Sequence, residues 1–160
     1  MSLVRISLRD FVIVHELELE LSAGFGVLSG ETGAGKSILI DALQLVLGGR
    51  ADAGVVREGA SRAEISAVFQ TQPHLNSWLQ DQGFDAEPED ILLRRSIDAQ
   101  GKSRAWVNGS PATATQLREL GDLLVDIHGQ HAWQSLTRPS AIRHLLDAYA
   151  GALNQTAELQ

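Results

Sequence analysis

Hydrophobic and polar residues alternate over several short segments of the chain, which is the pattern of strands with one face in water. The alternation is clearest where Leu17, Leu19 and Leu21 are separated by glutamates. The segments predicted as strands are Val4–Leu8, Val12–Leu21, Ala63–Gln70, Ile91–Ile97 and Ser103–Val107. Turn residues separate the last two segments, so they predict a hairpin.

Other segments have a different spacing. Apolar residues three and four positions apart predict helices over Lys36–Leu47, Leu75–Gln82 and Thr115–Leu120. Phe25–Ser29 and Leu123–Val125 are short apolar runs, and we interpret both as buried strands. Strands and helices in this order predict an α/β fold with a mixed sheet.

The composition narrows the class of protein. With 160 residues the chain suits one domain, and without cysteine it can form neither a disulfide nor a thiolate zinc site. No uninterrupted apolar region follows the N-terminal residues, so we expect no secretory signal. No apolar run approaches the roughly 20 residues that span a bilayer, so we expect a cytoplasmic protein. The net charge of -7 argues against nucleic-acid binding over the whole surface but leaves room for a local basic patch.

A glycine-rich stretch carries the strongest chemical signal. Its sequence is Gly30-Glu31-Thr32-Gly33-Ala34-Gly35-Lys36-Ser37, which fits the phosphate-binding loop G-x-x-x-x-G-K-[ST] at every fixed position. The glycines let successive N–H groups point at phosphate oxygens. The following helix adds its positive N-terminal end, and Ile38 in its first turn is the last of the candidate ATP-binding residues. Lys36 would reach the β- and γ-phosphates, and the Ser37 hydroxyl would ligate magnesium. The loop therefore predicts an ATP and Mg²⁺ site.

Three segments together resemble the RecN family of SMC-like bacterial DNA-repair ATPases. They are the stretch Leu8–Val14, the loop Gly30–Ser37 with the following Asp41–Arg50, and Asp126–His131. The resemblance implies the N-terminal half of a split ATPase head, whose missing C-terminal half would follow a long coiled coil. It also implies that two heads form a homodimer around two ATP molecules, and that the intact protein binds DNA near the nucleoid.

The same resemblance divides the chain. It implies the half-head over residues 1–138 and the root of a coiled-coil helix over 139–160. That last helix begins after Ser140, a plausible N-cap, and no stop signal precedes Gln160, so we expect the chain to continue. This half would hydrolyse ATP only in the intact dimeric protein.

Individual roles also follow from the resemblance. Gln130 would be the glutamine-loop residue that contacts magnesium and the attacking water, so Lys36 and Gln130 are the candidate catalytic residues. Arg9 would lie near the nucleotide, although the neighbouring Asp10 replaces the asparagine expected in the family. Arg57 is a candidate for the family's arginine near ATP or DNA, and a solvated surface arginine is its alternative.

Several residues keep alternative interpretations. Asp126 follows an apolar run and could itself be the magnesium ligand, which would favour a self-contained small P-loop phosphotransferase. His128 and His131 lack further metal ligands and more readily cap the glutamine loop. Arg94, Arg95, Lys102 and Arg104 form the best local candidate for DNA phosphate contact. The commoner explanation is a solvated basic hairpin that the acidic stretch Asp85–Asp90 balances. Core packing is the default for Trp78, Trp106 and Trp133.

Overall fold

The computed structural model describes residues 3–22, 24, 26–27, 35–71, 73–85 and 90–125. The chain divides into two compact units, Met1–Val125 and Asp126–Gln160, and every described residue belongs to the first. The predicted boundary at residue 138 and the predicted coiled-coil root therefore lie outside the described residues.

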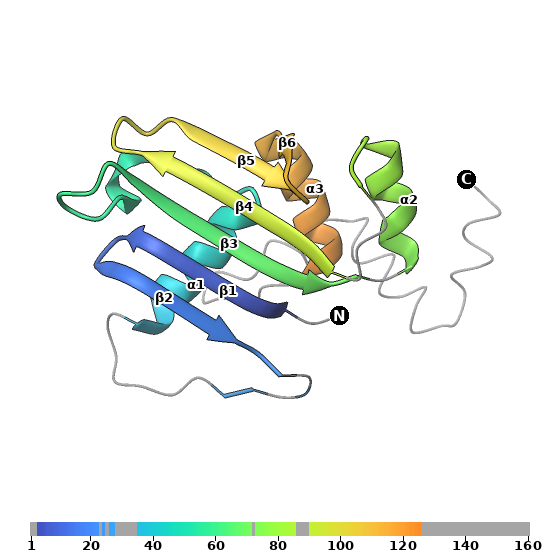
Figure 1. Ribbon diagram of the computed structural model, residues 1–160, viewed down its shortest axis with the longest axis horizontal. Coiled ribbons are helices and arrows are strands. Elements are labelled where there is room, and N and C mark those ends of the chain that lie inside the picture. The colour runs from blue at the N-terminus through green and yellow to red at the C-terminus, as the bar shows by residue number, and fades with distance from the viewer. Residues whose placement is uncertain are drawn as a thin grey trace, which may run out of the picture. The chain divides into compact units, whose positions relative to one another are not determined.

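Six strands form one sheet in the order β2-β1-β3-β4-β5-β6 (Figure 1). Their bounds are β1 Leu3–Phe11, β2 Val14–Glu20, β3 Arg62–Gln70, β4 Asp90–Asp98, β5 Ser103–Val107 and β6 Ser110–Ala112. Each described pair of neighbouring strands is antiparallel. The strands predicted from alternation are confirmed, including the hairpin of β4 and β5.

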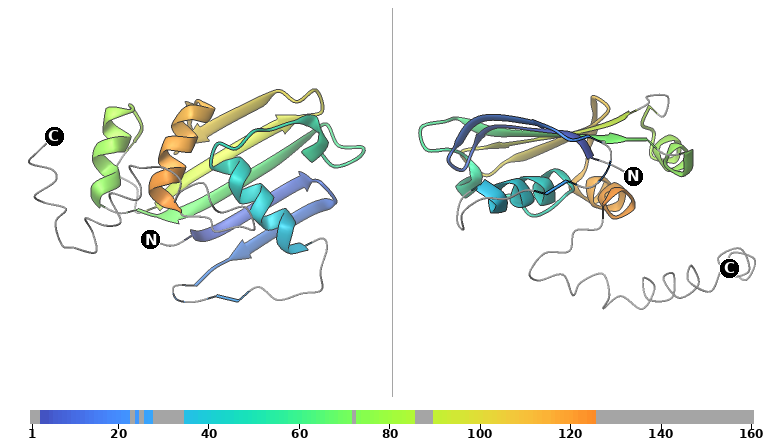
Figure 2. Two further views of the ribbon diagram at one scale, coloured as in Figure 1. Left: turned by 180° about the vertical axis from the view of Figure 1, so that it is seen from behind. Right: turned by 90° about the horizontal axis from the view of Figure 1, so that it is seen from below.

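One face of this sheet forms the hydrophobic core. Ala63, Ile65, Ala67 and Phe69 of β3 are completely buried and alternate with partly exposed or exposed residues. Two helices, α1 (Gly35–Val46) and α3 (Ala114–Leu124), lie against this face (Figure 2). None of the helices in the described part of the chain covers the opposite face of the sheet, which we call the open face.

The remaining elements are short helices and turns that connect the strands. A 3-10 turn, η1 (Ala53–Val55), follows α1, and the helix α2 (Pro73–Asp81) connects β3 to β4. Asn108 and Gly109 both have positive φ, 49° and 83°, which is the two-residue turn that joins β5 to β6. Thr113 and Gln116 form a capping box at the start of α3. No helix within the described residues has the length and apolar character needed to cross a bilayer.

The interpretation of Leu123–Val125 as a strand was wrong. Leu123 and Leu124 form the last turn of α3, and Val125 is its C-cap. The capping box starts this helix at Ala114, and the buried positions Leu117, Leu120 and Leu124 then follow helical spacing. The apolar run is the end of an amphipathic helix. A run of only three apolar residues suggested a short strand and was misleading.

The strand predicted at Phe25–Ser29 is not formed where the structure can be described. Gly26 and Val27 belong to no strand, and Val27 is 77% exposed. A strand needs a neighbour that accepts its hydrogen bonds, and the described residues place none beside these two. The rest of this segment lies outside the described residues.

Candidate nucleotide-binding site

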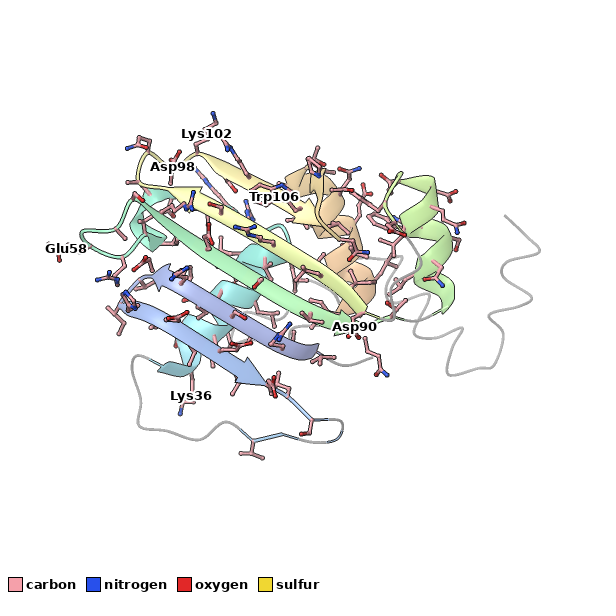
Figure 3. The ribbon with its side chains drawn as sticks, in the orientation of Figure 1. Lys36, Glu58, Asp90, Asp98, Lys102 and Trp106 are labelled. Carbon is pink, nitrogen blue, oxygen red and sulfur yellow. The ribbon has the colours of Figure 1, made fainter. Side chains whose placement is uncertain are left out.

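The first turn of α1 carries the end of the phosphate-loop motif. Gly35, Lys36 and Ser37 open the helix, and this turn contains no acidic side chain. Lys36 is partly exposed and Ser37 is exposed, whereas Ile38 is buried in the core, with 8% of its surface accessible. Lys36 lies at the start of the helix in Figure 3. The backbone N–H groups of a first helical turn, its positive helix end and a lysine make this turn suitable for phosphate.

The geometry also separates the roles that these residues can have. The hydroxyl of Ser37 is exposed, so it fits the oxygen ligand that Mg²⁺ prefers. Ile38 can offer only its backbone N–H, because its side chain packs against the sheet. A side chain on Gly35 would meet no atom within 4 Å, so the space beside the start of the helix is open.

The other end of α1 is fixed by two arginines. Arg95, on β4, donates hydrogen bonds to the carbonyl oxygens of Leu45 and Gly49, and its Nε donates to Ser103 Oγ at 2.8 Å. Arg118, on α3, donates to the carbonyl oxygen of Gly48 at 3.1 Å. The carbonyl oxygen of Leu45 also accepts the backbone N–H of Gly48 at 3.1 Å. The two arginines place positive charge beside the negative C-terminal end of α1 and so stabilise it.

Arg95 was expected in an exposed basic patch, and this expectation was wrong. Its side chain is 3% exposed and lies on the core face, between the buried Leu93 and Ile97. Burial lowers the pKa of Arg95 below the usual arginine value, and the charge of Arg118 lowers it further. The alternation of Leu93, Arg95 and Ile97 is a signal in the sequence that places all three on one face.

Close backbone contact holds α1 against α3. Gly48 ends α1 with a φ of 91°, and a Cβ there would lie 2.6 Å from Ala114 O and from Arg118 N. On α3, a Cβ on Gly121 would lie 3.0 Å from Leu47 Cβ. The predicted end of the helix at Gly48 is confirmed, and only glycine fits there, because of both the conformation and the contact.

Arg57 forms an ion pair, and 33% of its side-chain surface stays exposed. Its Nε lies 2.7 Å from Asp10 Oδ1, and its backbone N–H donates to Asp10 O at 2.9 Å. Phe11 forms an isolated bridge with Val56 beside this pair. Asp10 has a φ of 50°, a conformation that aspartate tolerates better than most residues. The ion pair therefore anchors the segment after η1 to the end of β1.

The structure does not bring Arg9 together with the start of α1. Ile6 and Leu8 point into the core under α1, and the alternation places Arg9 on the open face. There it lines a shallow concavity of about 320 Å³ with Glu16, Glu64 and other polar residues. The predicted place of Arg9 near the nucleotide finds no support in this geometry.

A family model described as AAA domain matches residues 5–117. The chain belongs to this AAA domain family. The match covers β1 to the middle of α3 and includes the whole phosphate-loop motif. The predicted α/β P-loop class is therefore confirmed.

The AAA domain is similar in sequence to RecN proteins. It is 48% identical over 151 residues to the DNA repair protein RecN of Vibrio cholerae and 44% identical over 158 residues to that of Bacillus subtilis. These matches cover 93% and 97% of the chain but only 27% of each relative. The resemblance to RecN is confirmed, and the chain spans about a quarter of the relatives' length.

A solved structure supports the fold of the domain. It is titled for ATP-driven dimerization and DNA-stimulated activation of SMC ATPases, with a TM-score of 0.66 at 22% identity. The match covers 92% of this chain and 98% of that one. At this identity the likeness shows that the AAA domain shares the fold of SMC ATPase heads.

Several predicted site residues of the AAA domain lie outside the described residues. These are Gly30, Glu31, Thr32, Gly33, Ala34, Asp126, His128, Gln130, His131 and Trp133. Their assignments stay predictions. Among the described residues, no group of three or more histidine, aspartate or glutamate side chains could hold a metal ion.

Proposed function

We propose that this chain is the ATP-binding part of a RecN-like ATPase head that acts in DNA double-strand-break repair and recombination. The observation that carries the proposal is the first turn of α1, where Lys36 and Ser37 end an intact phosphate-loop motif and no acidic residue opposes an anion. The similarity to proteins named DNA repair protein RecN supports the biological role.

The loop residues would divide the work of binding ATP. Backbone N–H groups from Gly30 to Gly35, with that of Ile38, would hold phosphate oxygens, and Lys36 would neutralise the β- and γ-phosphates. Ser37 and Gln130 would hold Mg²⁺, which when bound stabilises charge on the phosphates. Gln130 would also orient the attacking water.

The anchored end of α1 supports this division. Arg95 and Arg118 fix the last carbonyls of the helix to the sheet and to α3. Because the helix is rigid, its first turn keeps a defined position relative to the sheet. A fixed first turn lowers the cost of ordering the binding groups when phosphate arrives.

We also propose that the chain works within a larger assembly. The chain spans about a quarter of the length of the RecN proteins that it matches, which supports the remaining half of the same head as a partner. A second head would complete the ATP site in a homodimer, and DNA would be the partner of the intact protein. The activity would take place in the cytoplasm, at the nucleoid.

The phosphotransferase alternative is not favoured. It interpreted Leu123–Val125 as a strand that carries Asp126 to the metal, and these residues instead end α3. The curated relatives are named for DNA repair rather than for phosphotransfer.

Substitution of Lys36 tests the proposal. In Lys36→Ala, affinity for ATP with Mg²⁺ should fall at least tenfold, because the charge aimed at the phosphates is lost. Isothermal titration calorimetry measures the affinity, and a circular-dichroism melt checks the fold. Lys102→Ala is the matched control, since Lys102 is an exposed lysine in the turn before β5. Equal affinity in Lys36→Ala and wild type would contradict the assignment.

A further inference from the structure

The open face of the sheet is divided into an acidic and a basic part. The register places Glu16, Glu18 and Glu20 on the β2 edge, opposite Arg9, Ser7 and Arg5 of β1. Only Glu18 has an ion pair among the contacts recorded for these three glutamates, with Arg5 at 3.4 Å. The acidic part therefore lies at the β2 edge of the open face, and Arg5, which pairs with Glu18, points toward this edge.

The other half of the open face is basic and aromatic. Arg94 of β4 lies opposite Trp106 of β5, and Ser96 lies opposite Arg104. Leu92, two residues before Arg94, is 40% exposed on the same face. We call Leu92, Arg94, Lys102, Arg104 and Trp106 the Trp106 surface. Trp106 and Lys102 are labelled in Figure 3.

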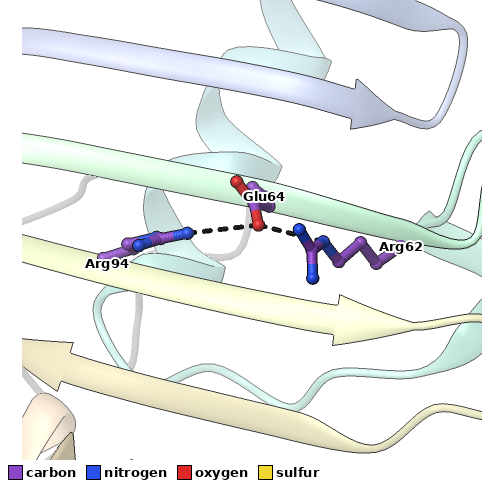
Figure 4. Close-up of polar contacts among 3 residues, drawn as sticks. All are labelled: Arg62, Glu64 and Arg94. Carbon is purple, nitrogen blue, oxygen red and sulfur yellow. Dashed lines mark hydrogen bonds and ion pairs between the residues drawn. The ribbon is translucent and has the colours of Figure 1, made fainter.

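Two carboxylates beside the Trp106 surface are already engaged. Glu64 lies between Arg62 and Arg94, with both N–O distances at 3.1 Å (Figure 4). Asp98 Oδ1 accepts the backbone N–H groups of Gln100 and Lys102 within the β4–β5 turn. Asp90, at the start of β4, is exposed on the same face and is the acidic group that would lie beside an anion at the Leu92 end of this surface.

Trp106 presents a site for a flat ligand. The guanidinium of Arg94 lies 5.3 Å from the centre of its ring, a cation–π contact. Trp106 is only partly buried, and its neighbours Ala105 and Val107 point into the core instead. An indole stacked with a guanidinium and flanked by Arg104 is the combination that binds an unpaired base and its phosphates.

We propose that the Trp106 surface binds single-stranded DNA. A base would stack on Trp106 or on the Arg94 guanidinium, and Arg104 and Lys102 would contact the adjacent phosphates. The β2 edge is three strand spacings from β4, about 14 Å, which exceeds the screening length of about 8 Å at physiological salt. Repulsion by the glutamates of β2 is therefore weak at this surface.

The same features favour a single strand over other anions. Bases in a duplex are stacked on each other and cannot lie on a flat sheet, whereas unpaired bases can. An acidic peptide would satisfy the arginines but offers no planar group for Trp106. This inference rests on the proposed role in DNA repair, but it does not depend on ATP binding at Lys36.

The test measures binding of a fluorescein-labelled 20-mer of thymidine by anisotropy, with the full chain and without nucleotide. Trp106→Ala should weaken binding roughly tenfold, the loss typical of one stacked base, while Trp106→Phe should retain most of the affinity. Arg104→Ser should reduce the slope of log K against log salt by about 0.7. Arg5→Ser is the control on the same face and should change neither quantity.

Three outcomes would overturn the proposal. They are equal affinity in Trp106→Ala and wild type, a polyglutamate peptide that competes as well as unlabelled oligonucleotide, and a duplex of the same length that binds as tightly. Thermal melts of each variant check the fold. If Trp106→Ala unfolds, the separate variants Trp106→Phe and Arg104→Ser still test the proposal. Lys36→Ala should bind the oligonucleotide normally, so failure here and failure of the ATP assignment are distinguishable.

Discussion

The guanidinium of Arg95 donates a hydrogen bond to the main-chain carbonyl oxygen of Leu45, in the last turn of α1. Arg95 belongs to β4, fifty residues further along the chain. The helix that begins at the phosphate loop therefore ends on a side chain from the centre of the sheet. The position of the first turn of α1 depends on this contact at its last turn, because the helix that joins the two turns is a rigid rod of about 18 Å.

Removal of the Arg95 charge should destabilise the fold. In Arg95→Met the carbonyl of Gly49 and the exposed hydroxyl of Ser103 lose the Arg95 donor, and the carbonyl of Leu45 keeps the N–H of Gly48. A buried acceptor without a partner costs about 1–3 kcal/mol, so we expect the free energy of unfolding to fall by about 1–3 kcal/mol. Urea denaturation followed by circular dichroism measures it.

Arg104→Met is the control for this change. Arg104 is exposed on the open face and one strand away from Arg95. The same substitution there should change stability by less than about 0.5 kcal/mol. If both variants unfold at the same urea concentration, Arg95 does not stabilise the end of α1.

Gly48→Ala should be costly for two reasons that can be separated. The φ of 91° is strained for alanine, and its Cβ would meet backbone atoms of Ala114 and Arg118 at 2.6 Å. We expect a loss of roughly 2–4 kcal/mol. Gly83→Ala is the matched control, because Gly83 has a φ of 77° and nothing within 4 Å.

The control isolates the conformational cost. Gly83→Ala should lose only about 1 kcal/mol, the cost of a left-handed alanine. Thermal melts and urea denaturation of both variants provide the comparison. Equal losses would mean that the contact between α1 and α3 can relax and that Gly48 is required for its φ alone.

The sequence predicted the strands well where one face is wet. In β3 every second residue is apolar, and in β4 Arg95 alone interrupts the same alternation on the core face. The end of α1 was equally predictable, since Gly48 and Gly49 stop a helix by their chemistry. These features depend on local pattern, so no tertiary information was needed.

The errors arose where tertiary structure decides. Leu123–Val125 is apolar because α3 packs on the sheet, and a three-residue run cannot distinguish a strand from the last turn of a helix. Trp106 was expected in the core, but its neighbours in β5 take the core positions. Arg57 was expected in solvent, and only the fold brings Asp10, 47 residues earlier, to its side.

This chain alone should bind ATP without appreciable turnover. Under the proposed function, a second head and the rest of a RecN-like protein, of which this chain spans about a quarter, would complete the catalytic site. A phosphate-release assay with purified chain measures turnover, and Lys36→Ala is the control for contaminating ATPases. Robust turnover that Lys36→Ala abolishes would favour a self-contained enzyme.

The last prediction distinguishes Gln130 from Asp126 in the reassembled head. Gln130→Ala should abolish most ATP turnover while leaving Mg²⁺-dependent ATP binding nearly unchanged, because a neutral amide orients water and contributes little binding energy. Asp126→Asn should leave Mg²⁺ affinity within about threefold of wild type, since we do not assign this carboxylate to the metal. If Asp126 were a direct ligand, its loss would remove a negative charge beside Mg²⁺ and weaken binding strongly.

The two variants need two separate measurements. Calorimetry with ATP at several Mg²⁺ concentrations gives the metal dependence of binding, and phosphate release gives turnover. Asp126→Asn removes one negative charge and Gln130→Ala removes one side-chain amide, at positions four residues apart. The end of α3 at Leu124 means that Asp126 does not follow a strand, which removes the geometric reason for placing it on the metal. Loss of Mg²⁺-dependent binding in Asp126→Asn, with intact turnover in Gln130→Ala, would reverse the assignment of the two residues.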